Sequence, residues 1–297
     1  MESLRGIIPP IVTPLHKDET LDIEGLEKLL DHVIKGGVHG IFILGTTGEG
    51  ASFSPDQKVE MIKRTLQLAN GRVPVLVNIS DTSYQISLKL AEKSKAYGAH
   101  AVVATPPFYL KINESEIISY YNQLIKGVSL PLYLYNNPGL TKLNLDPDIL
   151  QPLLKDPKVL GIKDSSGDAK YFNRVRRLKE LTKFSLFMGP EELLYESLIV
   201  GGDGGVPGGA NIFPELYVSL FNAVQERKYE DAFDIHQKIL EITSIVYHGD
   251  GYGSGKVISG IKSAMAVLGI CKTHVAKPLQ EASKSKTVNI RKLIEEI

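Results

Sequence analysis

The sequence has no tryptophan, a single cysteine and no excess of charge of either sign. Its 297 residues include 34 lysines and arginines against 34 aspartates and glutamates, so the formal net charge is zero. A neutral chain lacks the basic surface that polyanions attract, and we therefore expect no nucleic-acid partner. Cys271 has no second cysteine with which to form an internal disulfide, which fits a reducing compartment.

Long apolar stretches are also missing. No run approaches the ~20 residues that a membrane-spanning helix needs, and the first five residues do not follow the pattern of a secretory signal peptide. We therefore expect a cytoplasmic protein with no membrane partner. The 43% of hydrophobic and 23% of charged residues are typical of a globular domain.

The spacings typical of metal and nucleotide sites are absent as well. The seven histidines show no metal-ligand spacing, and one cysteine cannot complete a zinc site, so we expect no metal. Residues 251–256 are similar to a phosphate-binding loop, but that loop needs glycine where Asp250 stands and Ser or Thr where Val257 stands. No dinucleotide-binding fingerprint occurs either, and the sequence predicts no cofactor.

What the sequence does contain is a short apolar run followed by an amphipathic segment, eight times over. The runs lack polar alternation, which predicts parallel strands covered on both faces. The expected strands are 7–14, 40–45, 73–79, 101–104, 131–135, 159–163, 184–188 and 203–206. The expected helices that follow them are 21–34, 55–69, 84–97, 114–125, 146–154, 169–181, 191–200 and 214–226.

These eight units predict an α/β fold in which residues 1–226 form a (β/α)8 TIM barrel. A doubly wound open sheet is the rival architecture, but it would use fewer strands in this length. Residues 227–297 show helical patterns only, at 229–246, 256–268 and 289–297. We expect this C-terminal helical extension to pack on the barrel as part of one structural unit.

The carboxyl ends of barrel strands are where catalytic groups are expected. Lys163 closes the sixth apolar run, where shielding from water would disfavour its ammonium form. A neutral amine there can attack a carbonyl and form a Schiff base. Tyr135 ends the neighbouring strand, and a nearby cation would stabilise its phenolate as a base. The alternatives are a solvated lysine and a tyrosine that only packs its ring.

A second candidate lies after the second strand, where Gly45-Thr46-Thr47-Gly48 places two hydroxyl groups between two glycines. The glycines would let the backbone turn sharply, so that successive N–H groups converge on an anion such as a carboxylate. A tight turn without any ligand is an equal alternative.

Three motifs, each at a strand end, together resemble the dihydrodipicolinate synthase/N-acetylneuraminate lyase family. They are Gly45-Thr46-Thr47-Gly48-Glu49, Tyr135-Asn136-x-Pro138 and Gly161-Ile162-Lys163-Asp164. The resemblance covers nearly the full chain. It implies a pyruvate-dependent class I aldolase, assembled as a homotetramer (a dimer of dimers) and using no metal or organic cofactor.

The resemblance also implies roles for individual residues. Lys163 would form the Schiff base with pyruvate or another 2-oxo acid, and Tyr135 would shuttle the proton while the carbon–carbon bond is made or broken. Thr46 would lie close to Tyr135, and Val206 would line the site opposite the lysine. The carboxylate of the 2-oxo acid would be bound by the loop Gly45, Thr46, Thr47 and Gly48.

Two departures from the family pattern bear on the substrate. The synthases have an arginine where Leu140 stands, and leucine cannot pair with a second carboxylate. They also have a tyrosine, often contributed across a subunit interface, where Phe108 falls, although Tyr109 is the next residue. Both differences disfavour a true dihydrodipicolinate synthase.

The loop after the seventh strand is instead similar to the one with which sialic-acid lyases hold a hydroxylated chain. Gly189, Glu191 and Glu192 occupy it, and paired carboxylates can accept hydrogen bonds from vicinal hydroxyl groups. Ser165 matches a threonine in those lyases. An acidic helix N-terminus, where negative charge is favoured in any case, is the alternative for the two glutamates.

The sequence therefore predicts a lyase that cleaves a 2-oxo-3-deoxy sugar acid, or another 4-hydroxy-2-oxo acid, reversibly to pyruvate and an aldehyde. One alternative is 4-hydroxy-tetrahydrodipicolinate (dihydrodipicolinate) synthase, or a dehydratase that keeps the Schiff base. Another, from a different class, is a non-catalytic protein that binds 2-oxo acids.

Overall fold

The computed structural model describes residues 3–249 and 253–296, and within them eight parallel strands form one sheet. The strands follow one another in the order β1-β8-β7-β6-β5-β4-β3-β2, so each neighbour in the sheet except the β1–β8 pair is also a neighbour in the chain. The strands are β1 (Gly6–Ile7), β2 (Ile41–Ile43), β3 (Val75–Asn78), β4 (Ala101–Ala104), β5 (Leu132–Asn136), β6 (Val159–Asp164), β7 (Ser185–Met188) and β8 (Gly204–Gly205).

The sheet closes on itself between β2 and the segment that follows β1. Pro10 forms a parallel bridge with Phe42. The Phe42 N–H donates to the Pro9 carbonyl oxygen at 3.0 Å, and the Ile11 N–H donates to the Phe42 carbonyl oxygen at 3.0 Å. The expected TIM barrel is therefore confirmed. Of the first expected strand, 7–14, only Ile7 lies in β1 and Pro10 in this closing bridge.

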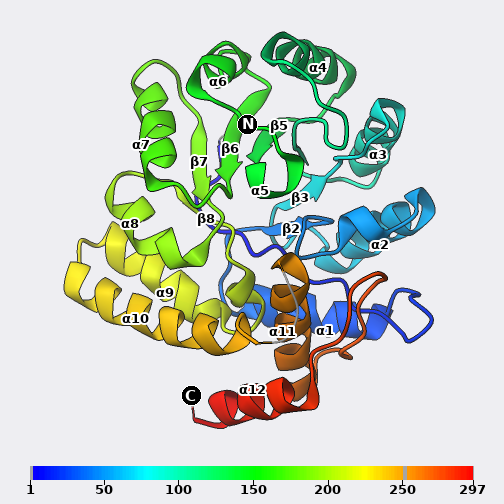
Figure 1. Cartoon of the computed structure of the whole chain (residues 1–297), viewed down its shortest axis with the longest axis vertical. Helices are drawn as coiled ribbons and strands as arrows, with labels where there is room; N and C mark the ends of the chain where they lie inside the picture. The colour runs from blue at the N-terminus through cyan, green and yellow to red at the C-terminus, as the bar shows by residue number, and fades with distance from the viewer. Residues whose placement is uncertain (1–2, 250–252, 297) are drawn as a thin grey trace.

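Helices surround the barrel, as Figure 1 shows. The helices are α1 (Ile23–Lys35), α2 (Pro55–Ala69), α3 (Tyr84–Ala96), α4 (Glu114–Gly127), α5 (Pro138–Thr141), α6 (Pro147–Leu153), α7 (Ala169–Arg177), α8 (Leu194–Ile199) and α9 (Pro214–Gln225). Beyond the barrel come α10 (Tyr229–Val246), α11 (Gly253–Val267) and α12 (Lys284–Glu296).

Local sequence explains where these helices begin and which face they bury. In α2, Ser54 and Gln57 form a reciprocal capping box around Pro55, which satisfies the free N–H groups of the first turn. In α1, Leu26 and Leu30, one helical turn apart, are both fully buried against the barrel.

Some boundaries differ from the sequence prediction. The last helix begins at Lys284 and not at residue 289, and α5 was not expected at all. The expected helix 191–200 is divided into a 3₁₀ turn, Glu191–Leu193, and the α-helix α8, Leu194–Ile199. Of the segment similar to a phosphate-binding loop, residues 250–252 lie outside the described residues, and so do the first two residues and residue 297.

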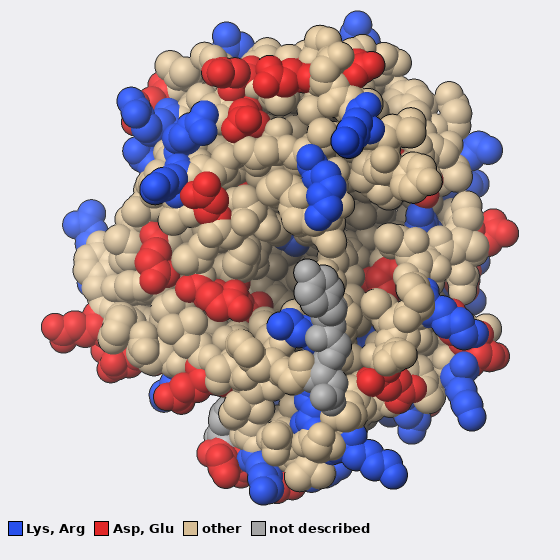
Figure 2. Space-filling view, in the orientation of Figure 1, with Lys and Arg blue, Asp and Glu red and all other residues tan. Residues whose placement is uncertain are grey.

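The interior of the barrel is a packed core. It is filled by the buried side chains of Phe42, Tyr133, Phe187 and Val206. The cavity that remains between these side chains and Lys163 is only about 10 Å³. A filled interior cannot admit a substrate from below, so any chemistry must take place at the mouth formed by the carboxyl ends of the strands. The face of the molecule in Figure 2 is hollowed near its centre, and charges of both signs are interspersed around it.

Candidate active site

The ends of β5 and β6 bring Tyr135 and Lys163 together. The two residues are direct partners in the register of the parallel pair. Lys163 is 8% exposed, and its Nζ lies 4.4 Å from the centroid of the Tyr135 ring and 5.0 Å from that of Phe42. An ammonium over two aromatic faces is held by cation–π attraction, in a position that water reaches poorly. The lysine therefore faces the barrel mouth and not the outer surface.

The Tyr135 phenol is almost fully buried and surrounded by hydrogen-bond donors. Its oxygen accepts a hydrogen bond from Asn137 Nδ2 at 3.0 Å. Burial by itself raises the pKa of Tyr135, but the Lys163 charge and hydrogen bonds with Thr46, Ser165 and Asn137 lower it, and the net pKa is below the ordinary value for tyrosine. The phenol is thus prepared to give up and recover a proton.

Successive residues of a strand point to opposite faces, so the residues after Tyr135 and Lys163 have a different role. Asn136 and Asp164 are also register partners, but they are fully buried and bonded to each other, with Asn136 Nδ2 donating to Asp164 Oδ1 at 3.0 Å. The Asn136 amide also donates to Asn144 and accepts from the Leu145 N–H. These contacts fix the ends of β5 and β6, and so the positions of Tyr135 and Lys163.

The loop after β2 carries Thr46 to the phenol, but it turns in a different way from the one expected. Leu44 and Glu49 take the left-handed conformation, with φ of 58° and 57°, whereas Gly45 and Gly48 do not. The glycines are required by close approach instead. A Cβ on Gly45 would lie 2.6 Å from the Phe42 ring, and one on Gly48 would lie 2.9 Å from the Ile11 carbonyl oxygen. Thr47 is half-buried on the same turn.

The loops after β6, β7 and β8 touch at the rim of the barrel. A Cβ on Gly189 would lie 2.1 Å from Ser165 Oγ, so these two residues are in contact, and Val206 is buried in the inner core. The structure separates the two glutamates that the sequence pairs. Glu192 is exposed, while Glu191 is buried.

The Glu191 carboxylate is hydrogen-bonded to groups in the protein interior. Both of its oxygens accept the Gly209 N–H at 3.1 Å, and it also accepts the hydroxyl of Tyr217. Burial raises the pKa of Glu191 to about 7, although the hydrogen bond from Tyr217 acts in the opposite direction. A carboxylate with these partners supports the loop after β8, and substrate hydroxyl groups would have to compete for it.

Phe108 and Tyr109 are on the segment between β4 and α4. Phe108 is half-buried, whereas Tyr109 is 92% exposed and has a φ of 80°. Leu140, on α5, is 54% exposed. The described side chains therefore bring Lys163, Tyr135, Thr46 and Ser165 together and leave Tyr109 pointing outward.

Three residues of the site were missed from the sequence: Asn137, which donates to the phenol, and the Asn136–Asp164 pair. Asn136 and Asp164 stand in the motifs quoted above, directly after Tyr135 and Lys163, but the sequence assigned them no role, and Asn137 follows Asn136. Among residues 3–249 and 253–296 there is no cluster of histidine, cysteine, aspartate and glutamate that could hold a metal ion. Nor does any helix in those ranges have the length and apolarity to cross a membrane.

Comparison with known proteins settles the family. The model of the dihydrodipicolinate synthetase family matches residues 3–297. The chain belongs to this family. It is 32% identical over 300 residues to the Escherichia coli protein named "Probable 2-dehydro-3-deoxy-D-pentonate aldolase YjhH", covering 99% of this chain and 97% of that one.

Two solved structures of the dihydrodipicolinate synthetase family have nearly the same backbone. The dihydrodipicolinate synthase of Bacteroides thetaiotaomicron is 44% identical, covers both chains completely and superposes with a TM-score of 0.95. YagE of E. coli K12, solved in complex with pyruvate, is 29% identical, covers 98% of each chain and gives a TM-score of 0.93. The family and the fold expected from the sequence are therefore confirmed, and so is an enzyme of the class I lyase type.

Proposed function

We propose that this chain is a pyruvate-dependent lyase that forms a Schiff base at Lys163 and cleaves a 2-oxo-3-deoxy sugar acid, or another 4-hydroxy-2-oxo acid, to pyruvate and an aldehyde. The observation that carries the proposal is the buried Lys163 amine over the ring of Tyr135, whose phenol has a lowered pKa. A simple binding protein would need neither a nucleophile nor an acid–base group beside it.

In this reaction the phenolate of Tyr135 takes a proton from the Lys163 ammonium, and the neutral amine attacks the C2 carbonyl. Tyr135 returns this proton to the carbinolamine hydroxyl, which leaves as water, and the iminium forms. Tyr135, again as phenolate, accepts the proton of the C4 hydroxyl, and the C3–C4 bond breaks as its electrons move toward the iminium nitrogen. Tyr135 gives that proton to C3 of the resulting enamine, and water then releases pyruvate from the lysine. Acid–base work of this kind contributes about 10²–10⁴-fold to the rate.

The loop Gly45–Gly48 binds the carboxylate of the 2-oxo acid in this proposal, through its backbone N–H groups and the hydroxyls of Thr46 and Thr47. Val206 lines the opposite side of the site. Toward the variable end of the substrate lie Ser165, Gly189 and Glu192, and Glu191 contributes by holding the Gly209 backbone in place. The cytoplasmic location and the lack of a cofactor remain predictions from the sequence.

A homotetramer is part of the proposal. Tyr109 is 92% exposed and Leu110 is 70% exposed on one segment, which an isolated chain would not favour. We propose that this segment lies against a second copy of the chain. Tyr109 would then reach the neighbouring site and replace the family's tyrosine, at whose position this chain has Phe108.

A second candidate, dihydrodipicolinate synthase, is favoured by the 44% identity to the B. thetaiotaomicron structure described under that name. Against it stands Leu140, where that activity is expected to need an arginine. Pyruvate release from a panel of 2-oxo-3-deoxy sugar acids, measured beside condensation of pyruvate with aspartate semialdehyde, separates the two. Faster turnover of aspartate semialdehyde would replace the lyase proposal with the synthase, and no turnover of either kind would favour a binding protein.

A further inference from the structure

A buried ion pair joins the loop after β2 to the C-terminal helices. Glu49, the last residue of the Gly45–Glu49 motif, contacts the Nζ of Lys262 on α11 through its Oε1, and both side chains have an exposed fraction of 0%. Figure 1 shows α11 standing beside the part of the barrel that contains β2. None of the chemistry proposed above uses either charge.

Each member of the pair has a further partner in the segment that follows α11. Glu49 Oε2 accepts the Ala276 N–H at 2.6 Å, and Lys262 Nζ donates to the His274 carbonyl oxygen at 2.6 Å. The pair is therefore clamped between the strand-end loop and residues 274–276. Such a contact fixes direction as well as distance, because both charges also bond to the backbone.

Glu49 is connected directly to the residues expected to bind the carboxylate. Its N–H donates to the Thr46 carbonyl oxygen at 3.0 Å, and its left-handed backbone closes the turn. On the opposite side, Thr13 Oγ1 donates to the Gly48 carbonyl oxygen at 2.7 Å. Besides the hydrogen bond between Thr46 and Tyr135, the loop is thus held by Thr13 on one side and by Glu49 on the other.

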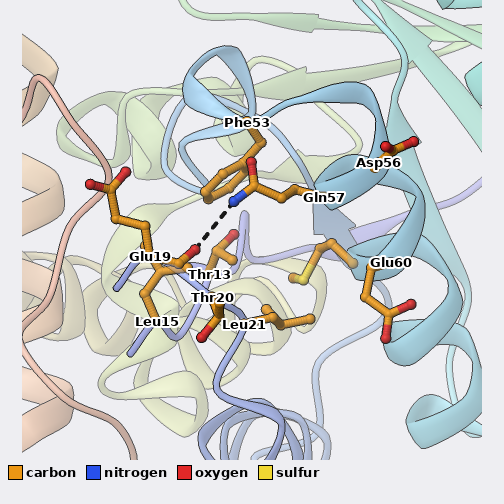
Figure 3. A pocket seen from close by; sticks show the side chains of 10 residues that line it. Thr13, Leu15, Glu19, Thr20, Leu21, Phe53, Asp56, Gln57 and Glu60 are labelled. Carbon is orange, nitrogen blue, oxygen red and sulfur yellow. Dashed lines mark hydrogen bonds between the residues drawn. The ribbon is translucent and has the colours of Figure 1, made fainter. Parts of the chain in front are cut away.

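Thr13 holds the loop by one hydrogen bond, whereas the Glu49–Lys262 ion pair makes two further hydrogen bonds to the backbone. Thr13 borders a cavity of about 270 Å³ between residues 13–21 and α2, and Phe53 and Gln57 lie across it from Thr13 (Figure 3). This cavity does not include Lys163 or Tyr135 and lies outside the proposed reaction.

Stability alone does not account for the pair. Burial raises the pKa of Glu49 and lowers that of Lys262, against the attraction between them, so placing both charges there is costly. Buried pairs can often be replaced by hydrophobic residues of similar volume without loss of stability. What such a pair provides is a defined position for the backbone attached to it.

We propose that Glu49 and Lys262 are positioning residues that hold the Gly45–Gly48 loop in the geometry needed to bind the carboxylate of the 2-oxo acid. The C-terminal helical extension is thereby part of the active site, although it contributes no group that touches substrate. The inference rests on the proposed function, because it assigns the loop the role of carboxylate binding.

The test uses the neutral double variant Glu49→Gln/Lys262→Met in the full chain. We expect it to fold, since both charges are removed together and the side-chain volumes are kept. Its KM for pyruvate in Schiff-base formation should rise roughly 10- to 100-fold, while the rate at saturating pyruvate stays within about threefold. Glu49→Gln alone should lose more stability than the double variant, because it leaves the Lys262 charge unpaired.

The matched control is Lys179→Met/Asp203→Asn, which removes an ion pair of 2.5 Å at the opposite end of the barrel, before β8. Its KM for pyruvate should not change. A folded Glu49→Gln/Lys262→Met variant whose KM equals that of the wild type overturns the positioning role, and so does an equal rise in the control.

Amide hydrogen exchange gives a readout that does not depend on activity. The double variant should exchange the N–H groups of residues 45–50 about tenfold faster than the wild type, and the control should not. If the wild type itself forms no Schiff base, the proposed function fails, but the exchange rates still decide whether the pair positions the loop. Unchanged exchange would refute it.

Discussion

The ends of β5 and β6 differ from the segment between β4 and α4 in how completely this chain assembles them. Lys163, Tyr135 and their hydrogen-bond partners are buried and mutually bonded. Tyr109, also expected to act in the site, is 92% exposed, and no described side chain holds it. The hydrogen bonds between paired strands fix the neighbours of a strand residue. A loop residue lacks these hydrogen bonds, so its position depends on contacts with a partner.

The largest loss of activity is expected from a substitution at the buried ends of β5 and β6. Tyr135→Phe removes the proton shuttle and should lower kcat by about 10²–10⁴-fold, as measured by release of pyruvate from a 2-oxo-3-deoxy acid. Schiff-base formation should slow as well but remain detectable. The control is Tyr133→Phe, two residues earlier on β5, whose hydroxyl accepts the Leu4 N–H instead. An active Tyr135→Phe enzyme would contradict the proposed shuttle.

A substitution at Glu191 tests whether the loops after β7 and β8 are also held by buried hydrogen bonds within the chain. Its folded pKa of about 7 lies above its ordinary value of 4.5. The stability that the protonated carboxyl provides is therefore full below pH 4.5 and is lost as the pH rises through 7. Relative to Glu191→Gln, the wild type should lose about 3 kcal/mol of unfolding free energy over that range, measured by urea titration at each pH.

Exposed Glu192 supplies the control for this measurement, since Glu192→Gln should leave the pH dependence of stability unchanged. If the wild-type and Glu191→Gln curves run parallel between pH 4.5 and 7, the carboxyl is not buried in solution as it is here. Glu191 would then be free to serve as a substrate ligand, as the sequence suggested.

A substitution at exposed Tyr109 tests the segment between β4 and α4. Tyr109→Ala should change the free energy of unfolding by less than about 0.5 kcal/mol, because the side chain is 92% exposed. Turnover should nevertheless fall roughly tenfold, because the neighbouring site loses the hydroxyl. Tyr97→Ala, at the end of α3 and 37% exposed, is the control. Full activity of Tyr109→Ala would remove the segment from the site.

The sequence predicted the barrel and the main pair of residues for one physical reason. Short apolar runs identify covered strands, and parallel strands end at one edge, so Lys163 and Tyr135 had to meet. The glycines of the β2 loop were identified correctly but for the wrong cause: Leu44 and Glu49 make the turn, while Gly45 and Gly48 avoid clashes.

What could not be predicted depends on side-chain contacts between distant parts of the chain. Nothing near Glu49 indicates that Lys262, far along the sequence, would neutralise it. The hydrogen bond between Glu191 and Tyr217 likewise depends on how α9 packs against the turn at Gly208–Asn211. Helix α5 escaped notice because four residues are too few to show helical periodicity.

Reduction with borohydride in the presence of pyruvate, followed by peptide mass mapping, tests the central claim most directly. We expect one covalent adduct, on the peptide that carries Lys163, absent from Lys163→Ala and retained in Lys170→Ala, where the lysine removed is exposed. An adduct on any other lysine, or no adduct at all at saturating pyruvate, would contradict the account.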